Sequence, residues 1–249
     1  MTNVGSPQIV VCANASEASL ATAQLISDAV AANPKTVLGL ATGGTPVGAY
    51  RELVRQHKEE GLDFSQACSF NLDEYIGLGP DHPQSFRYFM QSQLFDLINI
   101  DPNATHVPNG LVSDIAAHAQ QYEEQIRESG GIDLQLLGIG NNGHIAFNEP
   151  GSAIDSRTRE VDLTPDTIDA NARFFDSIDD VPKRAITMGI GTICEAARIV
   201  LMATGQAKSS AIQAAIEGPR DLSNPASLLQ GHSDLTFVLD QAAASKLSR

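Results

Sequence analysis

The sequence predicts an α/β fold with a mostly parallel sheet, and three observations carry this prediction. Short apolar runs alternate with longer segments of helical periodicity, and strands that alternate with helices form parallel sheets. Glycine-rich turns follow several of the apolar runs directly. The 249 residues are 42% hydrophobic and show no linker-like change of composition. We therefore expect a single domain over residues 1–249.

The charge balance restricts the classes of partner. Acidic residues outnumber basic ones by 30 to 16, which gives a formal net charge of −14. Nucleic acids and anionic membrane surfaces are bound by basic patches, so this charge argues against both as partners. No apolar run approaches the ~20 residues that span a bilayer. The first residues also lack the basic region of a secretion signal.

The cysteines indicate a reducing compartment. Cys12, Cys68 and Cys194 are odd in number, widely spaced and set in apolar surroundings. This pattern favours buried, reduced thiols over a disulfide framework or a zinc site. We therefore expect a cytoplasmic protein without a bound metal.

The first β-α unit begins with a β-branched run. Residues 8–13 are expected to form a strand, and Asn14 or Ser16 can cap the helix that follows. A second strand is expected over residues 36–40. Apolar residues at helical spacing predict the buried face of the first helix: Leu20, Ala23, Ile26 and Val30.

A glycine turn after the second strand fits a phosphate site. Thr42, Gly43 and Gly44 lead to Thr45, which can cap a helix that has Pro46 at its first position. Unpaired N–H groups and the helix dipole attract anions at such a place. No Lys follows the glycines, so the turn is not a nucleoside triphosphate loop. An ordinary tight turn explains the same residues equally well.

Two carboxylates follow the third expected strand. Residues 68–72 are apolar enough to be buried, and Asp73 and Glu74 come directly after them. Ligands of open parallel sheets bind at the carboxyl ends of the strands. A carboxylate held there can serve as a general base whose pKa is tuned by burial.

The remaining elements follow the same alternation. Helices are expected over 85–97, from Ser113-Asp114 to Ser129, and from Thr164 to a short segment that contains Arg173. Further strands are expected over 134–137, 185–188, 199–202 and 235–239, and an alanine-rich helical tail over 240–247.

A glycine-rich loop over residues 138–151 carries the strongest chemical pattern. Its glycines match the dinucleotide pattern G-x-G-x-x-G, but Pro150 and Gly151 would interrupt any helix that began at the third glycine. We therefore do not expect a nucleotide cofactor. The same loop contains His144 and, five residues later, Glu149. A histidine in a glycine loop close to a carboxylate fits an acid/base role.

A second Ala-Thr-Gly turn occupies residues 203–205, after the expected strand 199–202. Lys208 follows in the first turn of a helix expected to run to about Glu217. The helix dipole disfavours a cation there by ~0.3–1 kcal/mol. A bound anion would explain the lysine, and an exposed surface lysine is the alternative.

Several motifs together resemble the glucosamine-6-phosphate deaminase family, across nearly the whole chain. The combination of Asn-x-Asp-Glu-Tyr with Gly-x-Gly-x-x-Gly-His-Ile-Ala-Phe-Asn-Glu-Pro is specific. The resemblance implies a modified Rossmann-like, three-layer α/β/α sandwich, shared with ribose-5-phosphate isomerases and 6-phosphogluconolactonases. The matching segments are 40–46, 70–75, 138–150, 156–159, 171–175 and 205–208.

The resemblance also implies a reaction and the residues that perform it. Glucosamine 6-phosphate and water would give fructose 6-phosphate and ammonia, without a redox cofactor or a metal. Asp73 would move the proton from C2 to C1, and His144 would catalyse ring opening with Glu149 as its partner. By the same resemblance, a small-molecule sugar phosphate is the partner, and a homo-oligomer is compatible with it. The phosphate-binding residues would be Thr42, Gly43, Gly44, Thr45, Arg173 and Lys208.

One position departs from many members of the family. Asn142 stands where many of them carry Asp, and an amide can hydrogen-bond an imidazole but cannot stabilise an imidazolium by charge. We therefore expect Asn142 to assist catalysis. The longer, hexameric members are activated by N-acetylglucosamine 6-phosphate. Here Glu160 and Asp162 follow Arg159, and like charges repel a phosphate, so we expect no such activation.

Three alternative functions share parts of this pattern. A 6-phosphogluconolactonase would keep the fold and the phosphate turn but would not need Asp73 as a C2 base. A sugar-phosphate-sensing module would keep the phosphate groups and lose the acid/base residues, which are all present. An isomerase that retains the amine would release no ammonia.

Overall fold

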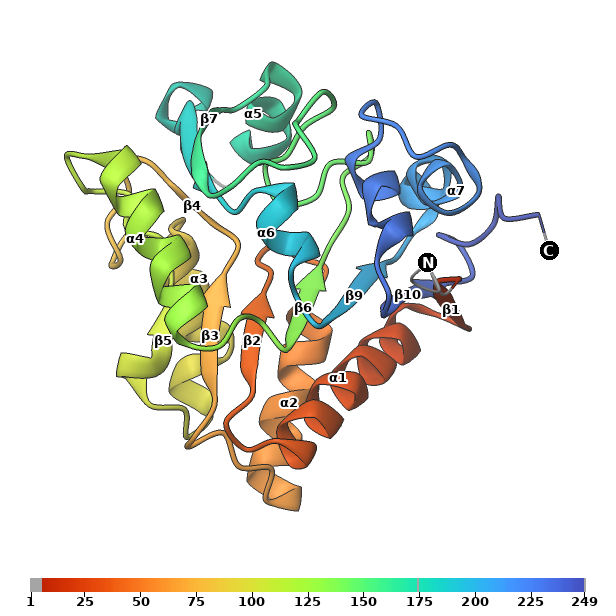
Figure 1. Cartoon of the computed structure of the whole chain (residues 1–249), viewed down its shortest axis with the longest axis horizontal. Helices are drawn as coiled ribbons and strands as arrows, with labels where there is room; N and C mark the ends of the chain where they lie inside the picture. The colour runs from red at the N-terminus through yellow and green to blue at the C-terminus, as the bar shows by residue number, and fades with distance from the viewer. Residues whose placement is uncertain (1–5, 174, 249) are drawn as a thin grey trace.

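The computed structural model describes residues 6–173 and 175–248, and its centre is a seven-stranded sheet (Figure 1). The strands of this sheet are β1 (Gln8–Cys12), β2 (Val37–Leu40), β3 (Cys68–Asn71), β5 (Thr105–His106), β6 (Leu134–Leu137), β9 (Arg198–Ala203) and β10 (Leu235–Asp240). Their order is β1-β10-β9-β6-β2-β3-β5. Every neighbouring pair is parallel.

Helices cover both faces of this sheet. The main ones are α1 (Ala15–Ala32), α2 (Val47–Glu60), α3 (Phe86–Gln93), α4 (Ile115–Glu128), α6 (Ile190–Cys194) and α7 (Ser209–Glu217). Crossovers between parallel strands are right-handed, so the connections that run toward β5 place α1, α2 and α3 on one face. The connections that run back toward β1 place α4, α6 and α7 on the other. This arrangement confirms the expected three-layer α/β/α fold.

A second, antiparallel sheet stands beyond the carboxyl ends of the main strands (Figure 1). It contains β4 (Asp73–Tyr75), β8 (Arg184–Thr187) and β7 (Arg159–Asp162), with α5 (Pro165–Ala172) beside it. β4 and β7 were not predicted from the sequence, because each is very short and polar, and neither was the two-residue β5 of the main sheet. The described residues also form five short 3-10 helices: η1 (Phe95–Leu97), η2 (Pro102–Ala104), η3 (Ile178–Asp180), η4 (Gln206–Lys208) and η5 (Pro225–Gly231).

The buried core agrees with two-sided coverage of the sheet. Every residue of β2, β6 and β10 is buried, as expected for strands packed on both faces. The helix α1 buries Ala18, Thr22, Ile26 and Val30 at a spacing of four. Leu20 was wrongly predicted to be inside: its exposed fraction is 48%, because it lies off this row of the helix.

Two local predictions about helices are wrong. Thr45 does not cap α2, since Pro46 occupies the N-cap position and its carbonyl accepts the N–H of Tyr50 at 2.9 Å. The alanine-rich tail forms turns rather than a helix. There the Asp240 carboxylate accepts the N–H groups of Gly205 and Ala243, which holds the chain in a turn. The cap predicted at Asn14 is confirmed, because its side chain accepts from the N–H of Glu17 at 3.0 Å.

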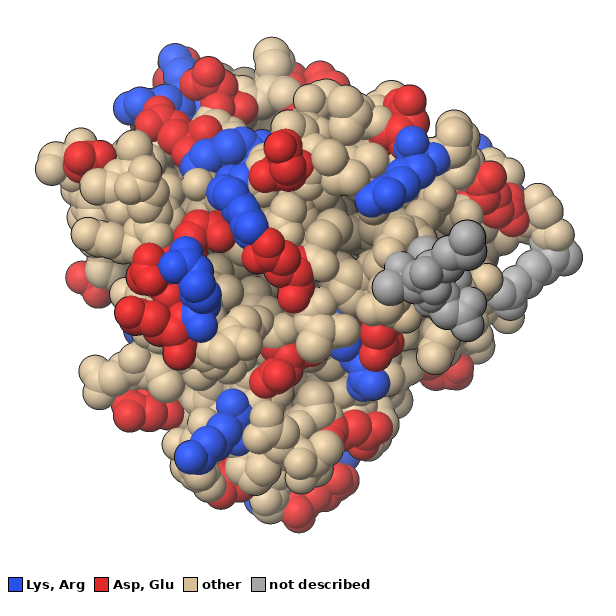
Figure 2. Space-filling view, viewed as in Figure 1, with Lys and Arg blue, Asp and Glu red and all other residues tan. Residues whose placement is uncertain are grey.

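Surface and cysteine features complete the fold. On the face drawn in Figure 2, Lys and Arg side chains are interspersed with Asp and Glu rather than gathered in one basic patch. Within the described ranges, no helix is both long and apolar enough to cross a membrane. Cys12, Cys68 and Cys194 are unpaired, and they are partly buried rather than fully buried as predicted.

Candidate active site

A cavity of about 480 Å³ opens at the carboxyl ends of β2, β3, β6 and β9. The chain leaves β2 toward β3 on one side and leaves β6 toward β9 on the other, while β2 and β6 are neighbours. Such a reversal of strand order is where open α/β sheets bind ligands. The volume lies in the range typical of small-molecule sites.

The six residues predicted to bind phosphate all line this cavity: Thr42, Gly43, Gly44, Thr45, Arg173 and Lys208. Gly43 has a φ of 88°, in the left-handed region that favours glycine. The turn precedes α2, so the positive end of that helix dipole faces the cavity. Lys208 lies in η4, just before α7, rather than inside the helix.

Two cationic side chains that line the cavity, Arg173 and Lys208, repel each other. Burial, and after it the charge of Arg173, lower the pKa of Lys208. An anion bound between the two side chains would relieve both effects. This electrostatic arrangement favours the anion-binding interpretation of Lys208 over a surface lysine.

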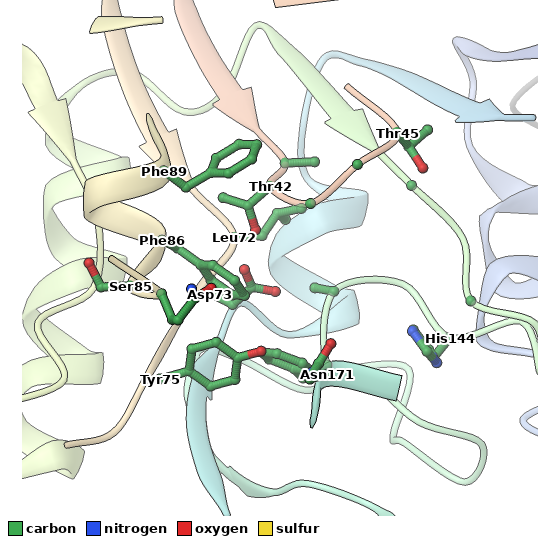
Figure 3. A pocket seen from close by; sticks show the side chains of 18 of the residues that line it. Thr42, Thr45, Leu72, Asp73, Tyr75, Ser85, Phe86, Phe89, His144 and Asn171 are labelled. Carbon is green, nitrogen blue, oxygen red and sulfur yellow. The ribbon is translucent and has the colours of Figure 1, made fainter. Parts of the chain in front are cut away.

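Asp73 lies on the wall formed by β4, and Figure 3 shows its carboxylate turned into the cavity. Its exposed fraction is only 6%. Burial, reinforced by the charge of Glu74, raises the pKa of Asp73 to about 8. A carboxylate poised near neutrality is suited to accept and return a proton.

His144 projects into the same cavity from the opposite side (Figure 3). Its Nδ1 lies 2.8 Å from Oδ1 of Asn142, and the Asn142 amide donates to Oε2 of Glu149 at 2.7 Å. Nδ1 and Oε2 of Glu149 are 3.5 Å apart. The imidazole is therefore held by an amide that is itself held by a carboxylate.

These contacts fix the tautomer of a neutral His144. Its backbone N–H, which can only donate, also points at Oδ1 of Asn142, at 3.2 Å. This assigns the amide orientation, so Nδ1–H donates to Asn142. Nε2 is left with its lone pair, available to take a proton from a bound ligand.

Glu149 stays ionised in this setting. Burial alone would raise its pKa, but the contacts with His144, Thr167 and Asn142 overcome this and lower the pKa of Glu149 to about 2. The Thr167 hydroxyl donates to its Oε1 at 2.7 Å. Neither Asn142 nor Glu149 lines the cavity. The structure thus separates the four predicted catalytic residues into two that face the cavity, Asp73 and His144, and two that hold the imidazole.

The backbone beneath His144 is built closely around the ring. A Cβ atom added to Gly140 would lie 2.2 Å from Cε1 of His144, so a side chain at this position would displace the ring. Ala146, which also lines the cavity, has a φ of 51°. Strained backbone of this kind is concentrated at functional sites. The loop contains no helix, as expected from Pro150.

Glu74 does not join Asp73 in the cavity, although the sequence placed the two carboxylates together. Successive side chains of a strand point to opposite faces, so Asp73 and Tyr75 line the cavity and Glu74 lies behind them. Its carboxylate accepts the N–H groups of Phe86 and Arg87, both at 2.9 Å.

An aromatic wall was missed by the sequence analysis. Tyr75 packs against the rings of Phe86 and Phe147 at centroid distances of 4.7 and 5.8 Å, and Phe175 lies 6.2 Å from Tyr75. All four residues line the cavity, together with Asn171. Three of them stand inside the motifs quoted above, so their positions were visible. Their shared wall was not, because four separate segments contribute one ring each.

The described parts of the chain contain no candidate metal site. No group of three His, Cys, Asp or Glu side chains there is arranged to hold a metal ion.

Comparison with known proteins decides the family. Residues 12–237 match the family model described as glucosamine-6-phosphate isomerases/6-phosphogluconolactonase. The chain belongs to this family. Within the family, a glucosamine-6-phosphate deaminase of Clostridium perfringens (strain SM101 / Type A) is 51% identical over 240 residues, which cover 96% of this chain and 99% of the relative. A deaminase of Rhodopirellula baltica is 53% identical over 242 residues, covering 97% and 96%.

Solved structures of the family have the same fold. A structure described as a monomeric glucosamine-6-phosphate deaminase superposes with a TM-score of 0.94 and 45% identity, and it covers 96% of this chain and 99% of its own. The 6-phosphogluconolactonase of Trypanosoma cruzi superposes with a TM-score of 0.76 and 24% identity, covering 98% of both chains. At that identity the second likeness concerns the fold alone.

Proposed function

We propose that this protein converts glucosamine 6-phosphate and water into fructose 6-phosphate and ammonia. The overall change is an aldose–ketose isomerisation coupled to loss of the amine. Relatives that are about half identical over nearly the whole chain are named glucosamine-6-phosphate deaminase. The cavity also offers groups suited to each step of this reaction.

The phosphate would bind at the turn of residues 42–45. Backbone N–H groups at the start of α2 and the dipole of that helix favour a dianion there. The cationic side chains of Arg173 and Lys208 face the same cavity. Because a phosphate would offset their repulsion, this end of the cavity is suited to anchor the sugar.

Ring opening would be assisted by His144. With Nδ1–H committed to Asn142, Nε2 can accept the proton of the anomeric hydroxyl and return it to the ring oxygen as the C1–O5 bond breaks. Glu149, whose pKa is about 2, stays anionic and stabilises the imidazolium that forms transiently. Asn142 hydrogen-bonds to both His144 and Glu149 and so holds the imidazole in a fixed orientation relative to the carboxylate.

Isomerisation would be carried by Asp73. Its carboxylate takes the proton from C2 of the open-chain aldehyde while O1 takes a proton from solvent, which gives an enolamine; the later hydrolysis of the iminium returns that proton to solvent. The proton taken from C2 returns to C1, leaving an iminium at C2. Water adds to that carbon and ammonia departs, so one water is consumed for each ketose formed.

The observation that carries the proposal is the pairing of Asp73 with His144 on opposite walls of one cavity whose far end is cationic. Lactone hydrolysis requires no base at C2, so Asp73 separates the deaminase from the related lactonase activity. The test is an assay for ammonia and fructose 6-phosphate, run beside an assay with 6-phosphogluconolactone. Turnover of the lactone alone would contradict the proposal.

We further infer that the chain works as one domain and that one copy contains a full site. The small sheet supplies a cavity wall through β4, and the main sheet supplies the rest. The related structure described as monomeric is compatible with this. Sedimentation of the protein with and without substrate tests it, and activity confined to an oligomer would contradict it.

A further inference from the structure

Glu74 is a buried acid that the mechanism above does not use. Its exposed fraction is 2%, and both carboxylate oxygens accept backbone N–H groups: Oε1 from Tyr75 at 2.8 Å and Phe86 at 2.9 Å, and Oε2 from Arg87 at 2.9 Å. No ion pair with Lys or Arg is formed within the described ranges. All of its partners are donors, which favours the ionised form. Burial outweighs these donors and raises the pKa of Glu74 to about 7, still below the pKa of about 8 for Asp73.

These contacts join two pieces of the cavity wall. Phe86 and Arg87 begin α3, and Ser85 before them is its N-cap. Ser85 and Phe86 line the cavity, as does Asp73 on the strand next to Glu74. The Glu74 carboxylate therefore fastens the start of a wall-forming helix to the strand that carries the reacting acid, where it also meets the positive end of the helix dipole.

We propose that Glu74 is a positioning residue for Asp73: it takes the negative charge of this buried pair first, and it ties β4 to the start of α3. The proposal rests on the role given to Asp73 in the proposed function. With Glu74 ionised, a second charge on the neighbouring Asp73 is disfavoured, so Asp73 holds its proton up to a higher pH. Asp73 thereby becomes a stronger base than an ordinary carboxylate.

The groups on the elements packed against β4 do not offset this charge. On α3, the Arg87 guanidinium turns away to Thr105, whose carbonyl and hydroxyl oxygens accept from it at 2.9 Å. On β8, the residues opposite Asp73 and Glu74 are Thr187 and Ile186, and neither is charged. The pair thus keeps its like-charge repulsion.

The groups beyond these elements are neutral or stand across the cavity. The Tyr122 hydroxyl on α4 donates to the carbonyl of Asn71 at 2.8 Å, and burial raises the pKa of Tyr122 well above its usual range. Burial and the charge of Arg87 lower the pKa of His106 on β5, which keeps it neutral. On β4 itself, burial and then the charges of Asp73 and Glu74 raise the pKa of Tyr75, so its hydroxyl stays neutral. The other charged or titratable side chains that face the pair, among the described residues, line the far side of the cavity: His144, Arg173 and Lys208.

Direct titration of the two carboxyls tests the proposal. Carbon NMR of protein labelled at the Asp and Glu carboxyl carbons, assigned with Asp73→Asn and Glu74→Gln, follows each group separately. We expect Glu74 to ionise before Asp73, and Glu74→Gln to lower the pKa of Asp73 by about one unit. An Asp73 titration that Glu74→Gln leaves unchanged would overturn the proposal.

Kinetics gives a second measurement. The acidic limb of the pH profile of kcat/KM should move to lower pH in Glu74→Gln by the same amount, and Glu74→Asp, which keeps the charge, should leave it closer to the parent position. Asp114→Asn is the matched control, because Asp114 caps α4 through the N–H of Ala117 at 2.9 Å and lies away from the cavity. An equal shift in this control would refute the specific role of Glu74.

The two measurements separate this proposal from the proposed function. Titration needs no turnover. An inactive parent protein would contradict the deaminase assignment, but titration of its two carboxyls would still decide the role of Glu74. If Glu74→Gln does not fold, the order of ionisation in the parent protein decides instead. Asp73 ionising first, or both groups titrating at ordinary values, would overturn the inference.

Discussion

The two walls of the cavity treat a carboxylate in opposite ways. Asp73 is buried beside another acid, and its pKa rises to about 8. Glu149 accepts from an amide and a hydroxyl beside His144, and its pKa falls to about 2. The same functional group thus holds its proton to about neutral pH on one wall and stays ionised on the other. Donor groups and solvation, rather than residue type, assign the role.

Removing the carboxylate of Asp73 should have the largest effect on turnover. Asp73→Asn keeps the shape and loses the base, so kcat should fall by ~10²–10⁴-fold, the usual contribution of a general base. Exchange of solvent deuterium into C2 should be lost with it. Asp101→Asn, which alters an exposed cap of η2, is the control and should keep the parent rate. Retained C2 exchange in Asp73→Asn would remove Asp73 from the proton transfer.

On the second wall, His144→Gln should affect a different step. Turnover of the cyclic sugar should slow by ~10²-fold or more, while an open-chain analogue should be affected less. Glu149→Gln should follow the same pattern with a smaller loss, because Glu149 contacts the imidazole and does not line the cavity. Pre-steady-state rates with both substrate forms measure this. Equal losses with both substrate forms would show that Asp73 and His144 do not act in separate steps.

The cationic end of the cavity should govern binding more than chemistry. If Lys208 binds the phosphate as proposed, Lys208→Ala removes a charge-assisted contact worth ~1.5–3 kcal/mol, so KM should rise by roughly 10–100-fold and kcat should change less. Lys246→Ala removes an exposed lysine that donates to Ser210 and is the matched control. A parent-like KM in Lys208→Ala would return Lys208 to the surface-lysine interpretation.

Stability should depend on pH with opposite signs at the two walls. The raised pKa of Asp73 means that its burial costs stability as pH rises from about 4 to about 8. Asp73→Asn should therefore raise the free energy of unfolding at pH 8 and change it little at pH 4. The lowered pKa of Glu149 stabilises the fold above about pH 4, and this is lost toward pH 2.

Glu149→Gln should accordingly be less stable than the parent at pH 7, with a difference that shrinks as the pH falls toward 2. Urea unfolding at several pH values measures both variants. Stability changes of the same sign in the two variants at neutral pH would contradict the contrast between the walls.

The smallest expected effect is that of N-acetylglucosamine 6-phosphate, which should not activate the enzyme. Arg159 is already engaged inside the fold, where it donates to Oδ1 of Asn148 at 2.9 Å, and Glu160 pairs with Arg184 at 2.5 Å. Initial rates with and without millimolar activator should superimpose on one hyperbola. A sigmoidal curve that the activator makes hyperbolic would disprove this.

The sequence predicted six of the seven strands of the main sheet, because these are apolar runs with clear turns at their ends. It missed β5, which has only two residues. It placed Asp73 at the carboxyl end of a strand, His144 in a glycine loop and Lys208 in the first turn of a helix, and the structure brings all three to one cavity. The order of strands, and hence the reversal between β2 and β6, is a tertiary property that no local pattern contains.

The failures have physical causes. Glu74 was grouped with Asp73 because sequence adjacency does not reveal that two strand positions face opposite ways. The cap at Thr45 failed because Pro46 already stands at the N-cap position. The tail after Asp240 has good helix formers, but a side-chain contact from Asp240 to Gly205 commits it to a turn. The roles of the individual site residues stay predictions until the variants are measured.

The imidazole of His144 rests on Gly140, and this has a consequence for redesign of the cavity. A single added methyl at this position would meet the ring at 2.2 Å, and the ring would have to tilt out of line with Asn142. Gly140→Ala would therefore displace the His144 imidazole without removing any polar atom of the site. The aromatic wall is a better place to enlarge or reshape the cavity for other amino sugars, because its side chains can be exchanged while the imidazole stays in position. These side chains are Tyr75, Phe86, Phe147 and Phe175.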